Sequence, residues 1–335
     1  MISLLVVNYR AAALAAEAVR TARAASSAAL QVVIVDNSCD AGEADALRGV
    51  ADTLIVSETN RGYAGAINLG RTSCDGQTIV VTNPDVTFAP RAIDLLVEQD
   101  AAVAGPALFW DDAHQWMLPP GDLMTGMQKL DEVLATRSRA YFEQRDRRRF
   151  LQRVRFWSLQ QPVAVHMLSG AVMAIRTRDF DALGGFDERF PLYFEETDFL
   201  RRVSAARKRI VYVPASRVRH LYNQSASQVA SEAATRFAQS EMRYLEKWNG
   251  PFAARTLKRL EKAMPRFDAT PLREPIAFDQ DVAIEASPLP SFATAAGRFA
   301  RTLETPRARW TGDLYLRAVV RSTGQILGTY KIEAA

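Results

Sequence analysis

The first 110 residues alternate between short apolar runs and alanine-rich stretches, which restricts the possible folds more than any other feature. Apolar runs of strand length occur at 3–9, 31–37, 53–58, 78–85 and, more weakly, 101–109. Stretches with helical character separate them at 11–29, 63–74 and 89–99. Strands that are apolar throughout are typical of a parallel sheet with helices on both faces. We therefore expect an α/β fold with a mainly parallel sheet flanked by helices.

Polar residues stand where these runs stop, and ligands of such sheets bind beyond the carboxyl ends of the strands. The signatures G-x-G-x-x-G and G-x-x-x-x-G-K-[ST] are missing, so neither a dinucleotide site nor a P-loop is indicated. The candidate segments are Asn8-Tyr9-Arg10, Asp36-Asn37-Ser38, Asn60-Arg61-Gly62 and Asn83-Pro84-Asp85.

Each of these segments has a functional interpretation and a structural alternative. Asp36 can accept hydrogen bonds from a base or a ribose, or it can cap a turn. Gly62 opens a helix whose N-terminus favours anions, and Arg61 adds positive charge for a diphosphate, but an ordinary strand-to-helix turn looks the same. Asp85 can bind Mg²⁺ or Mn²⁺, or it can be a turn residue.

Three acids follow an aromatic run in FPLYFEETDFLRRV, residues 190–203. Glu195 and Glu196 suit a helix N-terminus, and Asp198 can pair with Arg201 or Arg202 one turn later. Alternatively, a carboxylate beside an apolar wall has a raised pKa and is a better base. His220 is one of three histidines; a single histidine is more often structural than a metal ligand.

The remainder of the chain predicts a second half and an extension. Strand character returns at 163–177, and we expect a short helix and turn after it, a helix to about 207, a strand at 208–214 and helices at 226–247 and 251–263. Prolines interrupt the chain after Pro265, and residues 312–333 predict a β-hairpin. We expect three parts: 1–110, 111–265 and a C-terminal extension at 266–335.

Eight arginines and two acids lie between Arg137 and Arg155, in a chain whose net charge is +4. This predicts a basic amphipathic helix that faces an anionic membrane, an anionic substrate, nucleic acid or only solvent.

Three observations bear on where the protein is located. No run approaches the ~18 consecutive apolar residues that span a bilayer, and the first residues lack the pattern of a signal peptide. The two cysteines make no disulfide framework. We expect a cytoplasmic protein.

Six segments together resemble glycosyltransferase family 2, the inverting enzymes with the GT-A nucleotide-diphospho-sugar transferase fold, and within it the rhamnosyltransferase-like branch. They occur in the family's order over residues 1–225. The segments are VVNYR, VVIVDNSCD, NRGYAGAINLG, VVTNPDV, LSGAVMAIRTRDFDALGGFDERFPLYFEETDFLRR and RHLYNQSA.

The resemblance implies residue roles. Asp85 would be the main metal ligand, with His220 as a further ligand, for Mg²⁺ or Mn²⁺. The general base would be Glu196, where the family usually has Asp, with Glu195 and Asp198 beside it. The residues implied to bind the nucleotide sugar are Asn8, Tyr9, Asp36, Asn60, Arg61, Gly62, Asn68, Asn83 and Gly170.

The resemblance also implies an activity: single-displacement transfer of a sugar, with L-rhamnose from dTDP as the expected donor, to a cell-surface glycan or lipid-linked acceptor. The alternative is a catalytically degenerate member that binds a sugar nucleotide or glycan. Residues 137–155 would touch anionic lipid on the inner face of the plasma membrane, in preference to nucleic acid.

Overall fold

The computed structural model describes residues 1–335 except 120, 222–229, 264–266, 307–309, 311 and 334–335. Its residues form two compact units. The N-terminal unit comprises 1–107, 120–123 and 160–247, and the C-terminal unit comprises 108–119, 124–159 and 248–335.

A mixed sheet is the centre of the N-terminal unit. Its strand order is β3 (Thr53–Val56), β2 (Leu30–Asp36), β1 (Ile2–Asn8), β4 (Thr78–Thr82), β8 (Val172–Arg176), β6 (Val103–Phe109), β9 (Ile210–His220) and β5 (Val86–Phe88), and β7 (Val163–Ala164) pairs with β9. The first four strands are parallel, as the sequence predicts. In contrast, β8 runs antiparallel to β4 and β6, and β9 runs antiparallel to β5 and β7.

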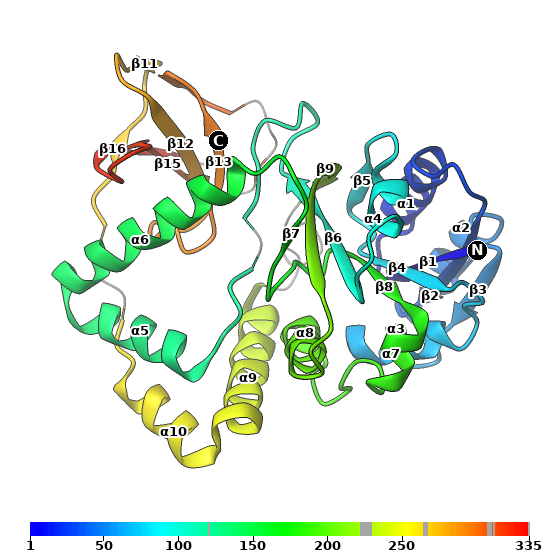
Figure 1. Cartoon of the computed structure of the whole chain (residues 1–335). Helices are drawn as coiled ribbons and strands as arrows, with labels where there is room; N and C mark the ends of the chain where they lie inside the picture. The colour runs from blue at the N-terminus through cyan, green and yellow to red at the C-terminus, as the bar shows by residue number, and fades with distance from the viewer. Residues whose placement is uncertain (120, 222–229, 264–266, 307–309, 311, 334–335) are drawn as a thin grey trace. The chain divides into compact units, whose positions relative to one another are not determined.

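Helices cover both faces of this sheet (Figure 1): α1 and α4 lie on one side, and α3, α7 and α8 on the other. Every third or fourth residue of α1 is a buried alanine, which allows close packing on the strands. The helices of the unit are α1 (Ala12–Ala24), α2 (Ala41–Leu47), α3 (Gly62–Arg71), α4 (Ala92–Val97), α7 (Thr177–Ala182), α8 (Glu195–Ala205) and most of α9 (Ala230–Asn249).

The strand character expected over 163–177 is confirmed at both ends of the segment, where β7 and β8 lie. Between them the chain brings the LSGA segment to the end of β4, where the Ala171 carbonyl accepts from the Asn83 amide. The first residues of the helix expected at 226–247 lie outside the described residues, and α9 is described from Ala230.

The C-terminal unit combines three helices with a second sheet. Its helices are α5 (Gly126–Arg137), α6 (Arg139–Trp157) and α10 (Pro251–Leu260). Its five-stranded sheet has the order β10 (Thr270–Pro271), β16 (Ile326–Ile332), β15 (Leu314–Val320), β12 (Val282–Ser287) and β13 (Ala296–Phe299), and β11 (Ile276–Ala277) pairs with β14 (Thr302–Leu303). The antiparallel pair β15–β16 confirms the expected hairpin.

The basic helix α6 packs on this C-terminal sheet. Phe150 and Trp157 of α6 form a buried cluster with Ala283 and Val319 of the strands. Segments 124–159 and 248–335 therefore belong to one unit, a grouping that differs from the three-part division expected from the sequence.

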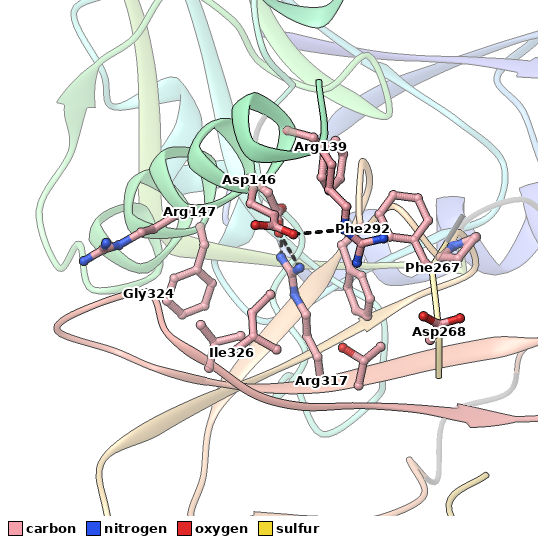
Figure 2. A pocket seen from close by; sticks show the side chains of 15 residues that line it. Arg139, Asp146, Arg147, Phe267, Asp268, Phe292, Arg317, Gly324 and Ile326 are labelled. Carbon is pink, nitrogen blue, oxygen red and sulfur yellow. Dashed lines mark hydrogen bonds and ion pairs between the residues drawn. The ribbon is translucent and has the colours of Figure 1, made fainter. Parts of the chain in front are cut away.

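Buried ion pairs join α6 to the strands beneath it. Arg317 donates to Asp146 at 2.6 and 3.0 Å and to Glu285 at 2.6 Å, and Arg153 also pairs with Glu285 at 2.7 Å. Beside this network lies a cavity of about 180 Å³, whose lining includes Asp146, Arg317 and Phe292 (Figure 2). The guanidinium of Arg317 stacks 4.1 Å from the Phe292 ring.

Several arginines of 137–155 thus bind within their own unit. Arg153 is buried, and Arg145 and Arg148 both pair with Asp131 of α5 at 2.7 Å.

Among the helices of the described residues, none has the length and apolar character needed to cross a bilayer.

Candidate active site

The end of β2 presents a buried carboxylate with one uncommitted oxygen. Asp36 is fully buried; its Oδ1 accepts from Asn8 Nδ2 at 3.0 Å and from the Ser38 amide at 3.2 Å. Its Oδ2 has no hydrogen-bond partner among the residues that the structure describes. Because a buried carboxylate oxygen is costly to leave unpaired, Asp36 is suited to a ligand N–H or O–H. Tyr9, next to Asn8 in the chain, is 41% exposed, and the Arg10 guanidinium lies 5.6 Å from the centre of its ring.

Asn37, which lies in the candidate segment Asp36-Asn37-Ser38 but was assigned no role of its own, fixes the loop after β3. Its Nδ2 donates to Asn60 Oδ1 at 3.0 Å and to the Gly62 carbonyl at 3.2 Å, and its Oδ1 accepts from the Arg61 amide at 2.9 Å. The loop leads into α3, where Arg61 occupies the N-cap position. The start of α3 is therefore held rigidly to the end of β2, with the exposed Arg61 side chain beside it.

The same loop is joined to the segment that carries the acids. The Tyr63 amide donates to the Pro191 carbonyl at 2.9 Å. Gly62 has φ +70°, and a Cβ at this position would lie 2.4 Å from the Pro191 carbonyl oxygen. Only glycine permits this approach, so the segment 60–63 is held directly against the segment 190–196.

Glu195 and Glu196 begin α8 and differ in their surroundings. Burial, followed by the charge of Glu196, raises the pKa of Glu195 well above its usual range. Burial also raises the pKa of Glu196, against the lowering effect of the Glu196 and Thr197 amides. The half-buried Glu196 extends past Gly170, where a Cβ would lie 3.0 Å from Glu196 Cγ. Gly170 thus makes room for the longer acid.

Tyr63, which was assigned no role of its own from the sequence, feels the charges of three predicted site acids. Burial raises its pKa well above the usual range, and the charges of Glu195, Glu196 and Asp85 add to this effect. Its hydroxyl is 3.5 Å from the Gly170 carbonyl oxygen. A tyrosine within NRGYAGAIN carried no separate sequence signal, because its neighbours come from segments 20 to 130 residues away.

Asp85 and His220 form a pair at the edge of the sheet. Val86 is registered opposite His220 in the β5–β9 ladder, which brings His220 Nε2 to 3.4 Å from Asp85 Oδ1. Both side chains are largely buried. In the part of the chain that is described, no group of three or more His, Cys, Asp or Glu residues could hold a metal.

Besides Asn8 and Asn60, further predicted site residues form contacts within the protein. Asp198 is fully buried and pairs with Arg202 at 2.9 Å, one of the two pairings expected from the sequence, and with Lys247 at 2.7 Å. Asn68 exchanges two hydrogen bonds with the Phe186 backbone, at 2.8 and 2.9 Å. Asn83 follows β4 and donates its amide to the Ala171 carbonyl at 2.9 Å, next to Gly170.

A family model described as "Glycosyltransferase like family 2" matches residues 1–240. The chain belongs to this family. The match includes Asp36, Asp85, Glu196 and His220, and the fold is that of the GT-A glycosyltransferases.

Characterised relatives of this glycosyltransferase family 2 chain include rhamnosyltransferases. An N-acetylglucosaminyl-diphospho-decaprenol L-rhamnosyltransferase of Mycobacterium tuberculosis is 27% identical over 57% of this chain and 66% of its own length. The rhamnosyltransferase WbbL of Escherichia coli is 32% identical over 26% of this chain and 33% of its own length. The chain therefore spans less than two thirds of either relative.

Among solved structures, a mannosyltransferase of Pyrobaculum calidifontis in complex with GDP-Man and Mn²⁺ has the same fold. The TM-score is 0.50 at 15% identity, covering 76% of this chain and 69% of that one.

Proposed function

We propose that this protein is an inverting glycosyltransferase that moves L-rhamnose from dTDP-rhamnose to a glycan or lipid-linked acceptor. The proposal is carried by the Asp85–His220 pair and by Glu196, a carboxyl group with a raised pKa; the charges of Asp85 and Glu196 both act on Tyr63. The mycobacterial relative, which by its name acts on a decaprenol-linked sugar, supports the choice of sugar and acceptor.

The arrangement supplies what a single displacement requires. Glu196 accepts the proton of an acceptor hydroxyl, whose oxygen then bonds to the anomeric carbon from the face opposite the leaving group. The bond between that carbon and the diphosphate oxygen breaks, and the nucleotide diphosphate leaves with the electron pair. Asp36 Oδ2 and Tyr9 hold the nucleoside, while Arg61 and the N-terminus of α3 face the diphosphate.

Asp85 and His220 fit a divalent cation as a two-ligand set. Mg²⁺ and Mn²⁺ bind through few protein ligands when phosphate oxygens complete the shell, and carboxylate and imidazole are both suitable donors. Such a cation, Mg²⁺ or Mn²⁺, would neutralise charge on the departing diphosphate.

The α6 surface supports a second part of the proposal, peripheral contact with anionic lipid near a lipid-linked acceptor. Arg147, Arg148 and Arg155 of α6 are exposed, although Arg148 pairs with Asp131. Flotation with vesicles of phosphatidylglycerol and phosphatidylcholine tests this contact. We expect the Arg147/Arg148/Arg155→Ala variant to float less than the wild type; equal flotation would contradict the contact.

Hydrolysis of dTDP-rhamnose in the presence of Mn²⁺ tests the enzymatic proposal. We expect wild-type turnover, and a loss of about a hundredfold or more in Asp85→Ala and Glu196→Gln, because each removes a group needed in the transition state. Matched controls are Asp45→Ala and Glu17→Gln, which change exposed acids of helices α2 and α1.

Two outcomes would separate the alternatives. Binding of dTDP-rhamnose without hydrolysis or transfer by the wild type would favour the catalytically degenerate binder. Turnover that survives Glu196→Gln would assign the base elsewhere.

A further inference from the structure

The turn that leads into α8 has a backbone that its residues seldom adopt. Tyr193 and Phe194 are consecutive and have φ +67° and +69°, in the left-handed region that favours glycine. Bulky residues keep such a conformation only when surrounding contacts impose it. Glu195 and Glu196 follow immediately, so this turn sets the direction in which their side chains leave the backbone.

One face of α9 supplies the contacts. Phe237, Ser240, Tyr244 and Lys247 are spaced by three or four residues and share a side of the helix, here named the clamp face. Phe237 packs its ring 5.5 Å from Tyr193 and 5.3 Å from Phe194, and the Tyr244 ring lies 5.3 Å from Phe194.

The other two residues of the clamp face bind on either side of the turn. Ser240 Oγ donates to the Leu192 carbonyl at 2.8 Å. Lys247 Nζ lies 2.8 Å from Asp187 and 2.7 Å from Asp198. The clamp face therefore holds the chain before, within and after the two left-handed residues.

We infer that the clamp face positions the Glu196 carboxyl group for proton removal by imposing the left-handed turn that precedes it. The inference rests on the proposed function, because it assigns α9 a role in that reaction. None of the clamp residues is proposed to touch the substrate; they are positioning residues.

The exposed fractions of the clamp residues decide which of them can be changed to test this role without unfolding the protein. Tyr244 is fully buried, so its removal would unfold the surroundings, but Phe237 is 44% exposed. The Phe237→Ala variant can therefore fold while losing both ring contacts to the turn. Phe252 of α10 is 85% exposed, and Phe252→Ala is the matched control for deleting an exposed ring.

The experiment combines hydrogen–deuterium exchange of peptides covering 192–198 with steady-state kinetics on dTDP-rhamnose and Mn²⁺. In full-length Phe237→Ala we expect faster exchange in this segment, a kcat about tenfold to a hundredfold lower and a donor KM unchanged within about twofold, because a misplaced base slows chemistry without weakening donor binding. Phe237→Tyr, which keeps the ring, should restore both readouts, and Phe252→Ala should match the wild type.

Two results would overturn the inference: unchanged exchange at 192–198 in Phe237→Ala, or faster exchange with unchanged kcat. A wild type without turnover would instead refute the proposed function and with it the catalytic role of the clamp face. The exchange measurement would then still decide whether α9 holds the turn.

Discussion

The carboxyl group of Glu196 should make turnover depend on pH. Burial raises its pKa above the ordinary 4.5, so the group is protonated, and unable to accept a proton, over a wider acidic range than an exposed glutamate. We expect kcat/KM for dTDP-rhamnose hydrolysis to rise with pH, with a midpoint above 4.5. A profile already flat at pH 5 would contradict Glu196 as the base.

Glu195 should lower the stability of the fold as pH rises. Its folded-state pKa is raised, so its contribution to folding is fully present below its unfolded-state pKa and is lost as pH rises through the folded-state value. Glu195→Gln should therefore be near neutral at pH 4 and more stable than the wild type at pH 9, by about 1–3 kcal/mol. Urea unfolding at both pH values measures this difference; equal differences would contradict it.

The effect of a substitution at Gly170 on kcat should depend on the length of the acidic side chain at position 196. A Cβ at Gly170 would lie 3.0–3.4 Å from Glu196 Cγ, Cβ and Cδ, so Gly170→Ala should displace the carboxyl group and lower kcat about tenfold. In a double-mutant cycle, Gly170→Ala should cost less when Glu196→Asp removes one methylene. Additive effects of the two changes would mean that the contact does not matter for the reaction.

Between elements, Gly62 joins the loop before α3 to the segment before α8. Gly62→Ala should raise the donor KM at least about tenfold and destabilise the fold by more than about 1 kcal/mol, because φ is +70° and the new Cβ meets the Pro191 backbone. Gly49→Ala is the control, since Gly49 has φ +82° but nothing within 4 Å of a Cβ. If both variants lose equal stability in urea unfolding, the contact with Pro191 adds nothing.

The elements show which parts of the site a sequence can predict. Asp36 and Asp85 could be chosen as candidates because one apolar strand ends at Asp36 and another ends at Thr82, shortly before Asp85, and the ends of parallel strands lie at one edge of a sheet. The seven-residue α2 and three-residue β5 are too short to give a periodic signal. The left-handed turn before Glu195 was not predictable, because aromatic residues rarely adopt it and its support comes from α9, more than 40 residues later.

Across the whole molecule, the stability of the C-terminal unit should depend on its buried ion pairs. Arg317→Met leaves Asp146 and Glu285 buried without their shared partner, so we expect a loss of about 3–5 kcal/mol in urea unfolding of the transition assigned to this unit. Arg321→Met breaks the largely exposed pair with Asp281 and should cost at most about 1 kcal/mol. Equal losses in the two variants would contradict a structural role for the buried network.

The C-terminal unit also has a consequence for how the protein is made. Asp146 of α6 and its partner Arg317 of β15 are separated by 171 positions in the chain. During synthesis, α6 therefore leaves the ribosome well before the strands that cover its apolar side chains and its buried charged residues have been made. Until β12 and β15 emerge, that helix is a natural target for chaperones, and nascent chains halted before β15 should be more prone to aggregation than the finished protein.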